Sequence, residues 1–283
     1  MTRVATILRL GRVSNLPTVW TNALAAAVLA AGATLPGRTV LAAAAILSLF
    51  YIGGMWLNDA FDAEIDARER STRPIPAGEI GRVAVFAVGG ALLAIGIVGG
   101  FGFGPAAGAA ALALAATVLL YDWLHKRTVS SPVIMGATRF LCYVFAALAL
   151  GALPWLVLVA AFGLFAYVVG LTYAAKQEAY DRLDRAWPLA VLAFPLLVAL
   201  VLAWGNALAL AICLSLAALM AVALRRLFRS DKGDVPKAVV TLIAGMSLYD
   251  AALLAAVGAP GLAILAVAGC GLTLLLQRVV PGT

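Results

Sequence analysis

Long apolar runs, each about as long as a bilayer-spanning helix, alternate with short polar connectors along this chain. About 20 apolar residues cross a bilayer as a helix. By that length the sequence predicts spans at 16–34, 40–58, 82–101, 104–121, 132–151, 154–174, 188–204, 206–224, 237–257 and 260–277. The run 188–204 is short enough to be re-entrant or merely buried. We therefore predict an all-α, polytopic transmembrane bundle of nine to ten helices, forming one membrane-embedded domain over residues 1–283.

The connectors alternate in charge. One set is rich in Arg and Lys, from Arg3 and Arg9 to Arg278, whereas the other set carries only Arg38. Cytoplasmic loops hold the excess of Lys and Arg in membrane proteins. The pattern places the basic connectors, both termini and every acidic residue except Asp250 on the cytoplasmic side, and we expect a bacterial inner membrane.

Composition supports this class of protein. Apolar residues make up 64% of the chain and charged residues 12%, whereas soluble domains carry about 25% charged residues. The net charge of +7 lies in the connectors, so it does not indicate nucleic-acid binding. Cys142, Cys213 and Cys270 lie far apart inside apolar runs and are interpreted as core residues. His125 is the only histidine, which excludes a His-rich metal site, and we expect it at the aqueous boundary; residues 1–14 show no signal-peptide cleavage pattern.

Acidic residues gather at the end of the second apolar run, in Asn58-Asp59-Ala-Phe-Asp62-Ala-Glu-Ile-Asp66. If the helix continues, Asn58, Asp62 and Asp66 recur every four residues and drift by only about 40° per step. Like charges this close repel one another unless a cation lies between them, and oxygen ligands suit a hard cation. The alternative is a solvated loop with incidental acids, which the helical phasing disfavours. The sequence therefore predicts a hard-cation site at a helix end.

Basic residues and a second polar patch accompany this stripe. Arg73 follows it in the next connector, and the segment 176–185 follows the sixth run with further acids and bases. Two helix ends on one membrane face can bring both patches together. Acids beside arginines and lysines suit a diphosphate that is held through Mg²⁺ and directly by the cations.

The pattern Asn58-Asp59-x-x-Asp62-x-x-x-Asp66, followed by Arg73-Pro-x-Pro-x-Gly, resembles the first signature of the UbiA superfamily of intramembrane prenyltransferases. Tyr121 with Lys126 is similar to the family's Tyr-then-Lys element, and 9–17 resembles its first-helix start. The resemblance implies an Mg²⁺-dependent enzyme with a UbiA-like fold. Such an enzyme moves an isoprenyl group from an isoprenyl diphosphate donor to a lipophilic acceptor, for instance an aromatic one, within the lipid bilayer and without nucleic acid.

The second family motif, Asp-x-x-x-Asp, departs from the pattern, because Gln177 and Asp181 occupy its positions. The nearby acids Glu178 and Asp184 are candidates to substitute, but three acids at i+3 steps spread over about 120° of a helix. The run Tyr173-Ala-Ala-Lys-Gln-Glu is similar to divergent UbiA-like branches, including one linked to the Ebo gene cluster. A second metal would then be held more weakly or by a different subset.

The resemblance assigns roles to residues of this chain. Asn58, Asp62 and Asp66 would hold the first metal, and Glu178, Asp181 and Asp184 the second. The expected catalytic residues are Asp62, Asp66, Lys126, Arg139 and Asp181. The expected substrate-binding residues are Asn22, Asp59, Arg73, Tyr121, Lys126, Arg139, Tyr173 and Gln177.

Three polar residues lie deeper in the predicted spans. Arg139 sits about two turns into the fifth run, and because a buried Arg must pair, we expect a diphosphate or the acid cluster as its partner rather than a backbone carbonyl. Asp250 would either shape the acceptor pocket or make a hydrogen bond between helices. Asn22 has the same two alternatives.

Other functions stay open at this point. A membrane terpene cyclase would use the same donor site without a separate acceptor, and a catalytically divergent member would bind lipid diphosphates without turnover. A secondary transporter would need polar sites near the midplane in broken helices, whereas these acids lie at the membrane surface. The sequence leaves open the donor chain length, the acceptor, the oligomeric state, and whether the Gln177 motif supports two-metal activity.

Overall fold

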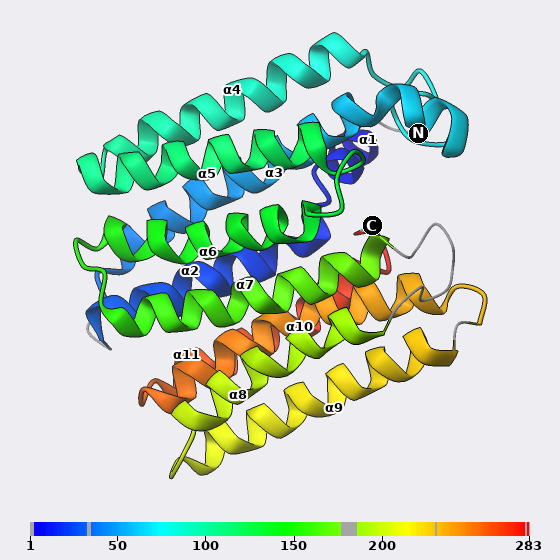
Figure 1. Cartoon of the computed structure of the whole chain (residues 1–283). Helices are drawn as coiled ribbons and strands as arrows, with labels where there is room; N and C mark the ends of the chain where they lie inside the picture. Colours follow the sequence, from blue (N-terminus) through cyan, green and yellow to red (C-terminus); the bar gives the residue numbers. More distant parts are fainter. Residues whose placement is uncertain (1–2, 33–34, 177–185, 230, 281, 283) are drawn as a thin grey trace.

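The computed structural model describes residues 3–32, 35–176, 186–229, 231–280 and 282, and these form helices joined by turns, without a strand among them (Figure 1). The helices are α1 (Arg3–Leu10), η1 (Val13–Asn15), α2 (Leu16–Ala31), α3 (Gly37–Glu69), α4 (Arg82–Phe101), α5 (Pro105–Leu124), α6 (Ser131–Ala149), α7 (Trp155–Lys176), η3 (Trp187–Leu192), α8 (Ala193–Leu202), α9 (Ala207–Arg229), α10 (Asp234–Ala256) and α11 (Pro260–Leu276). Each predicted apolar run has a helical counterpart. The prediction of a polytopic helical bundle is confirmed.

Fewer helices qualify as spans than the ten runs suggested. Within the described residues, seven helices are long and apolar enough to cross a membrane, namely α3, α4, α5, α6, α7, α9 and α10. The helices α2, α8 and α11 are shorter, with 16, 10 and 17 residues. The run at 188–204 is divided because a 3-10 helix with a proline in its first turn precedes α8.

The central helix of the bundle is α10, which packs against α2, α7, α9 and α11. Two tyrosines fix its distance from α7: the hydroxyl of Tyr167 donates to the carbonyl of Leu242, and that of Tyr249 to the carbonyl of Ala160, each at 2.9 Å. Each tyrosine hydroxyl packs on a glycine of the other helix, Tyr249 on Gly163 and Tyr167 on Gly245. A Cβ on Gly163 would lie 2.0 Å from the Tyr249 hydroxyl, so a larger residue does not fit there. Close approach of two helix backbones through small residues is typical of membrane bundles.

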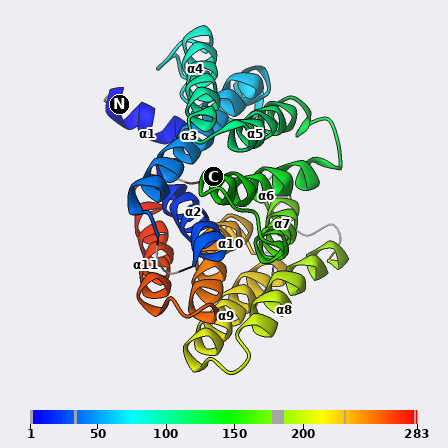
Figure 2. The same ribbon diagram turned by 90° about the vertical axis from the view of Figure 1, so that its left-hand side faces the viewer.

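The outer helices expose large apolar side chains, as lipid-facing helices do. In Figure 2, α4 and the pair α8 and α9 form opposite edges, with α2, α6, α7 and α10 between them. Ile95 and Val98 on α4 and Leu214 on α9 are more than half exposed. Exposing such an apolar surface to water is unfavourable, whereas exposing it to lipid is not.

The helix that carries the acid stripe is the longest one. With 33 residues, α3 is about 50 Å long, well beyond the roughly 30 Å of a bilayer's hydrocarbon core. Its last third, 58–69, therefore continues the helix past the apolar run. Both chain ends lie at this same end of the bundle (Figure 1).

Candidate functional site

The predicted acid stripe exists and is buried. Asn58, Asp59, Asp62 and Asp66 lie on one continuous helix, and each residue is 8% exposed or less. A solvated loop would have left these side chains open to water. The site is therefore built into the packed end of the bundle.

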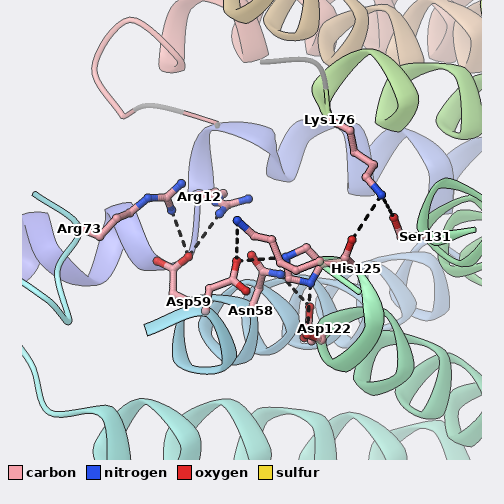
Figure 3. Close-up of polar contacts among 10 residues, drawn as sticks. Arg12, Asn58, Asp59, Arg73, Asp122, His125, Ser131 and Lys176 are labelled. Carbon is pink, nitrogen blue, oxygen red and sulfur yellow. Dashed lines mark hydrogen bonds and ion pairs between the residues drawn. The ribbon is translucent and has the colours of Figure 1, made fainter. Parts of the chain in front are cut away.

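Two arginines hold Asp59 from different segments. Its Oδ1 accepts hydrogen bonds from Arg12 Nη2 at 3.3 Å and from Arg73 Nη1 at 3.1 Å (Figure 3). Burial and the charge of Arg12 lower the pKa of Arg73. Burial also disfavours the charged form of Arg12, but Asp59 and neighbouring groups outweigh that effect and raise its pKa. Both guanidinium groups remain charged, so together with Asp59 they carry one net positive charge beside the carboxylates of Asp62 and Asp66.

The backbone at Arg12 has an uncommon conformation. Arg12 has φ of 41° and is the only residue other than glycine with positive φ in the described parts of the chain. Such a conformation costs about 1–3 kcal/mol for a residue with a Cβ and is retained only where surrounding contacts enforce it. Arg12 lies just before η1, where the chain turns from α1 into α2.

Asp62 contacts the end of α5. Its Oδ2 lies 3.0 Å from His125 Nε2 and 3.7 Å from Lys126 Nζ. The His125 ring stacks on Tyr121 at 5.1 Å between centroids, and its Nδ1 lies 3.2 Å from the carbonyl of Asp122. Lys126 and Tyr121, which were expected to bind substrate, therefore lie beside the stripe, and His125 belongs to the same cluster.

Asn58 contacts a further carboxylate, Asp122 on α5. Asn58 Nδ2 donates to Asp122 Oδ1 at 3.1 Å. Because a carboxylate accepts hydrogen bonds, this contact fixes the amide with its NH₂ group toward Asp122 and its carbonyl oxygen directed elsewhere. Asp122 Oδ2 is buried and has no hydrogen-bond partner among the described residues.

Lys176 fastens the connector after α5 to the end of α7. Its Nζ donates to Ser131 Oγ at 2.9 Å and lies 3.4 Å from the carbonyl of His125 (Figure 3). It also donates to the carbonyl of Thr128 at 2.9 Å. The last described residue before 177–185 is thereby tied to the connector that carries His125 and Lys126.

An apolar pocket begins beside this cluster and extends into the bundle between α2, α3, α5 and α6. It is lined by Val19, Leu47, Phe50, Tyr51, Gly54, Met55, Leu114, Val118, Tyr121, Asp122, Met135, Thr138, Arg139 and Cys142. At 1.5 Å per residue, its wall on α3 extends about 12 Å, from Met55 to Leu47. Tyr121 and Asp122 stand at its polar end, and Phe50 and Leu47 lie toward the opposite end.

Arg139 lies on the pocket wall but does not pair with the acid stripe. Arg139 Nη1 donates to Asn22 Oδ1 at 2.9 Å, and its guanidinium lies 5.6 Å from the ring centre of Tyr51. Asn22 Nδ2 in turn donates to Asp250 Oδ2 at 2.7 Å, and Tyr143 donates to Asp250 Oδ1. The expectation of the acid cluster as the partner of Arg139 is thus corrected, because eight residues of α6, about 12 Å, separate Arg139 from the helix start at Ser131. Of the alternatives for Asn22 and Asp250, hydrogen bonding between helices is the one observed.

Of the remaining predicted residues, the structure describes only Tyr173. Tyr173 lies near the end of α7 and does not line the pocket. Gln177, Glu178, Asp181 and Asp184 lie outside the described residues. Within the described ranges, three or more Asp, Glu, His or Cys side chains do not converge on one point as a metal site.

Three residues of the cluster were missed from the sequence. Asp122 had a signal, because it directly follows Tyr121 in the last turn of an apolar run. His125 had one too, since it lies one turn after Tyr121 and beside Lys126. Arg12 lies within the 9–17 segment that resembles the family's first-helix start, but no local pattern indicates its pairing with Asp59.

Comparisons with known proteins agree with this architecture. The sequence model of the UbiA prenyltransferase family matches residues 18–249. The chain is similar to the digeranylgeranylglyceryl phosphate synthase of Ignicoccus hospitalis, at 39% identity over 101 residues, which are 35% of this chain and 33% of that protein. It is also similar to the protein of the same name from Methanothermobacter thermautotrophicus, at 29% identity over 150 residues, 52% of each chain. These matches span about a third to a half of the length of the curated relatives.

A solved structure, described as giving structural and mechanistic insights into the biosynthesis of digeranylgeranylglyceryl phosphate synthase in membranes, is similar in fold. It superposes with a TM-score of 0.65 at 19% identity, covering 92% of this chain and 100% of that chain. At this identity the likeness concerns the fold alone.

Proposed function

This chain belongs to the UbiA prenyltransferase family, and we propose on that basis that it transfers an isoprenyl group from an isoprenyl diphosphate to a lipophilic acceptor inside the membrane. The observation that carries the proposal is the junction of the acid stripe with the apolar pocket. Asp122, which lines the pocket, is hydrogen-bonded to Asn58 of the stripe. An isoprenyl diphosphate has a charged head joined to a hydrocarbon tail, so its binding site must join a polar region to an apolar one.

The diphosphate head belongs at the stripe. Lys126, Arg73 and Arg12 lie at the mouth of the site and already contact carboxylates there. Charge-assisted hydrogen bonds from Arg and Lys to phosphate oxygens are strong and geometrically specific. These three cations would bind the diphosphate and stabilise the charge that develops on it as the carbon–oxygen bond breaks.

The stripe suits Mg²⁺ in its chemistry. Asn58, Asp62 and Asp66 supply hard oxygen donors on one helix face, and the contact with Asp122 directs the carbonyl oxygen of Asn58 away from that carboxylate. Mg²⁺ is usually held by one or two carboxylates together with waters and substrate phosphates, so a complete protein cage is not required. When bound, the ion would neutralise charge on the leaving diphosphate. Glu178, Asp181 and Asp184 are proposed for a second, weaker site.

The isoprenyl tail belongs in the pocket. Half of its lining residues are Leu, Val, Met or Phe, and these apolar side chains would keep water away from a reactive allylic cation. The rings of Tyr51 and Tyr121 line the same space, and aromatic faces attract cations. Arg139, held by Asn22, would bind a polar group of a substrate from the opposite wall. The product would then leave sideways into the lipid.

The orientation in the membrane is part of the proposal. We place the acid stripe and both termini on the cytoplasmic side of a bacterial inner membrane, because the basic connectors lie at that end of the bundle. The names of the relatives suggest a prenylated glyceryl phosphate lipid as one product to test.

The decisive experiment measures transfer from a labelled isoprenyl diphosphate in membranes supplied with Mg²⁺. Asp62→Ala should abolish transfer, because it removes the central carboxylate of the stripe. Glu64→Gln is the matched control, since Glu64 lies on the same helix but its side chain is 78% exposed. Undiminished transfer by Asp62→Ala would overturn the assignment, whereas equal loss in both variants would point to damage of α3 as a whole.

A further inference from the structure

Three arginines line a hollow at the end of α9, away from the acid stripe. Val222, Arg225, Arg226 and Arg229 bound a space of about 280 Å³. They recur at i, i+3, i+4 and i+7, so they share one face of the helix over its last two turns. The end of α9 lies at the same end of the bundle as both chain ends (Figure 1). Because α9 contributes no described residue to the lining of the apolar pocket, this arginine hollow is separate from the proposed donor site.

The charge of Arg229 is neutralised by carboxylates. Its Nε and Nη2 donate to the two oxygens of Asp234 at 2.7 and 2.8 Å, and Nε lies 2.9 Å from Asp231 Oδ2. The Asp234 side chain is 1% exposed, so the pair is held between the end of α9 and the start of α10. A contact through two parallel hydrogen bonds fixes the plane of the guanidinium group. Arg229 is therefore a fixed part of the wall, with little charge left for a ligand.

Arg225 and Arg226 keep their positive charges. Arg226 Nη1 donates to Thr241 Oγ1 at 3.0 Å and to the carbonyl of Lys237 at 3.5 Å, and both acceptors are neutral. Arg225 is exposed and has no carboxylate within ion-pair distance among the described residues. The segment 225–237 contains five basic and two acidic residues, a net charge of +3. The arginine hollow therefore offers two guanidinium groups to a ligand, in surroundings with an excess of positive charge.

The arginine hollow opens beside a lipid-facing surface. Val222 in its wall is 47% exposed, and Phe228, next to Arg229 in the sequence, is 62% exposed. With 23 residues, α9 is about 35 Å long, slightly more than the roughly 30 Å of a bilayer's hydrocarbon core. Its last turns therefore lie where acyl chains meet the headgroups. Basic pockets at this level bind the headgroups of anionic lipids.

We propose that the arginine hollow binds the headgroup of an anionic phospholipid, whose phosphate oxygens accept hydrogen bonds from Arg225 and Arg226 while an acyl chain lies along Val222. A zwitterionic phospholipid also has a phosphate, but the positive group of its headgroup would be repelled by the excess positive charge. Arginines at a helix C-terminus also stabilise the helix dipole, but that role requires no hollow and no preference among lipids. The proposal does not depend on the transferase function, because lipid binding can be measured without donor or acceptor.

The test measures lipid binding to the purified, delipidated protein in detergent by native mass spectrometry. The probes are dioleoyl phosphatidylglycerol, which is anionic, dioleoyl phosphatidylcholine, which has the same chains, and glycerol phosphate, which has a phosphate but no chains. The wild type should bind phosphatidylglycerol at least fivefold more tightly than phosphatidylcholine, and excess glycerol phosphate should not displace it. Equal affinity for the two lipids would overturn the proposal. Displacement by glycerol phosphate would indicate a site for free phosphate and would overturn it as well.

Two variants locate the binding. Arg225→Gln removes an exposed charge that has no carboxylate partner among the described residues, so the protein should fold as the wild type does. Its affinity for phosphatidylglycerol should fall about fivefold, the scale of one basic residue near a membrane surface. The double variant Arg225→Gln/Arg226→Gln should lose about 25-fold if the two contributions add.

Arg68→Gln is the matched control. Arg68 is also an exposed arginine in the last turn of a long helix, and the end of α3 lies at the same end of the bundle (Figure 1). Its removal changes the net charge equally and should change the affinity less than twofold. If Arg68→Gln weakens phosphatidylglycerol binding as much as Arg225→Gln, the attraction is a general effect of net charge, and the proposed site is refuted.

Discussion

Replacing Asp59 with Asn tests whether the two-arginine contact organises the site. The carboxylate is 6% exposed and each guanidinium-bearing side chain 18% exposed, so both ion pairs are largely removed from water. The variant keeps the shape of the side chain but leaves Arg12 and Arg73 with like charges and one neutral acceptor between them.

The expected loss of stability is substantial. Removing one partner of a buried ion pair costs about 3–5 kcal/mol. The guanidinium groups here can still turn toward water, and the Asn oxygen accepts one hydrogen bond, so we expect about 2–3 kcal/mol, at or below the low end of that range. Because Arg12 and Arg73 then lose their fixed positions, the KM for the isoprenyl diphosphate should also rise.

The assay is reversible unfolding in mixed detergent micelles, with Glu64→Gln as the matched control. Glu64 pairs with Arg82 at 2.8 Å, but the two side chains are 78% and 40% exposed, and exposed pairs contribute about 0–1 kcal/mol. Adding Arg73→Gln to Asp59→Asn should recover part of the lost stability, because one of the two like charges is removed. If Asp59→Asn is as harmless as Glu64→Gln, the reasoning about this contact is wrong.

Three further predictions concern the metal, the pocket and the deep network. Chelation with EDTA should abolish prenyl transfer and added Mg²⁺ should restore it; activity that persists in EDTA would contradict the metal assignment. Gly54→Leu should reduce transfer of long isoprenyl chains at least tenfold, because Gly54 lines the pocket and even a Cβ there would lie 2.9 Å from Val118, whereas Gly90→Leu, in open space, should not. Asp250→Leu should destabilise the protein by about 3–5 kcal/mol, because it leaves the buried Asn22 and Tyr143 without their shared acceptor and Arg139 without compensating charge. An unfolding free energy within about 1 kcal/mol of the wild type would contradict this prediction.

The stripe on α3 was predictable because its signal is local. The four-residue spacing of Asn58, Asp62 and Asp66 and the apolar run before them determine both the helix and the face on which the acids lie. The alternation of basic and uncharged connectors is also visible directly in the sequence. It predicts that the polar helix ends lie on one side of the membrane.

The pairings between helices were not predictable in the same way. Asp122 meets Asn58 across 64 residues of sequence, and Asn22 meets Arg139 across 117. Both contacts depend on which helices pack side by side, and the apolar runs are too alike to specify that. A long buried Arg could have reached several partners, and only the packing of α2 against α6 selects Asn22.

The central claim is that the head of an isoprenyl diphosphate binds at the stripe while its tail occupies the pocket between α2, α3, α5 and α6. A structure with Mg²⁺ and a non-hydrolysable geranylgeranyl diphosphate analogue tests this directly. We expect density for the diphosphate beside Asn58, Asp62 and Asp66, and density for the tail running past Gly54 toward Phe50. A diphosphate bound at another end of the bundle, or a tail outside this pocket, would contradict the account.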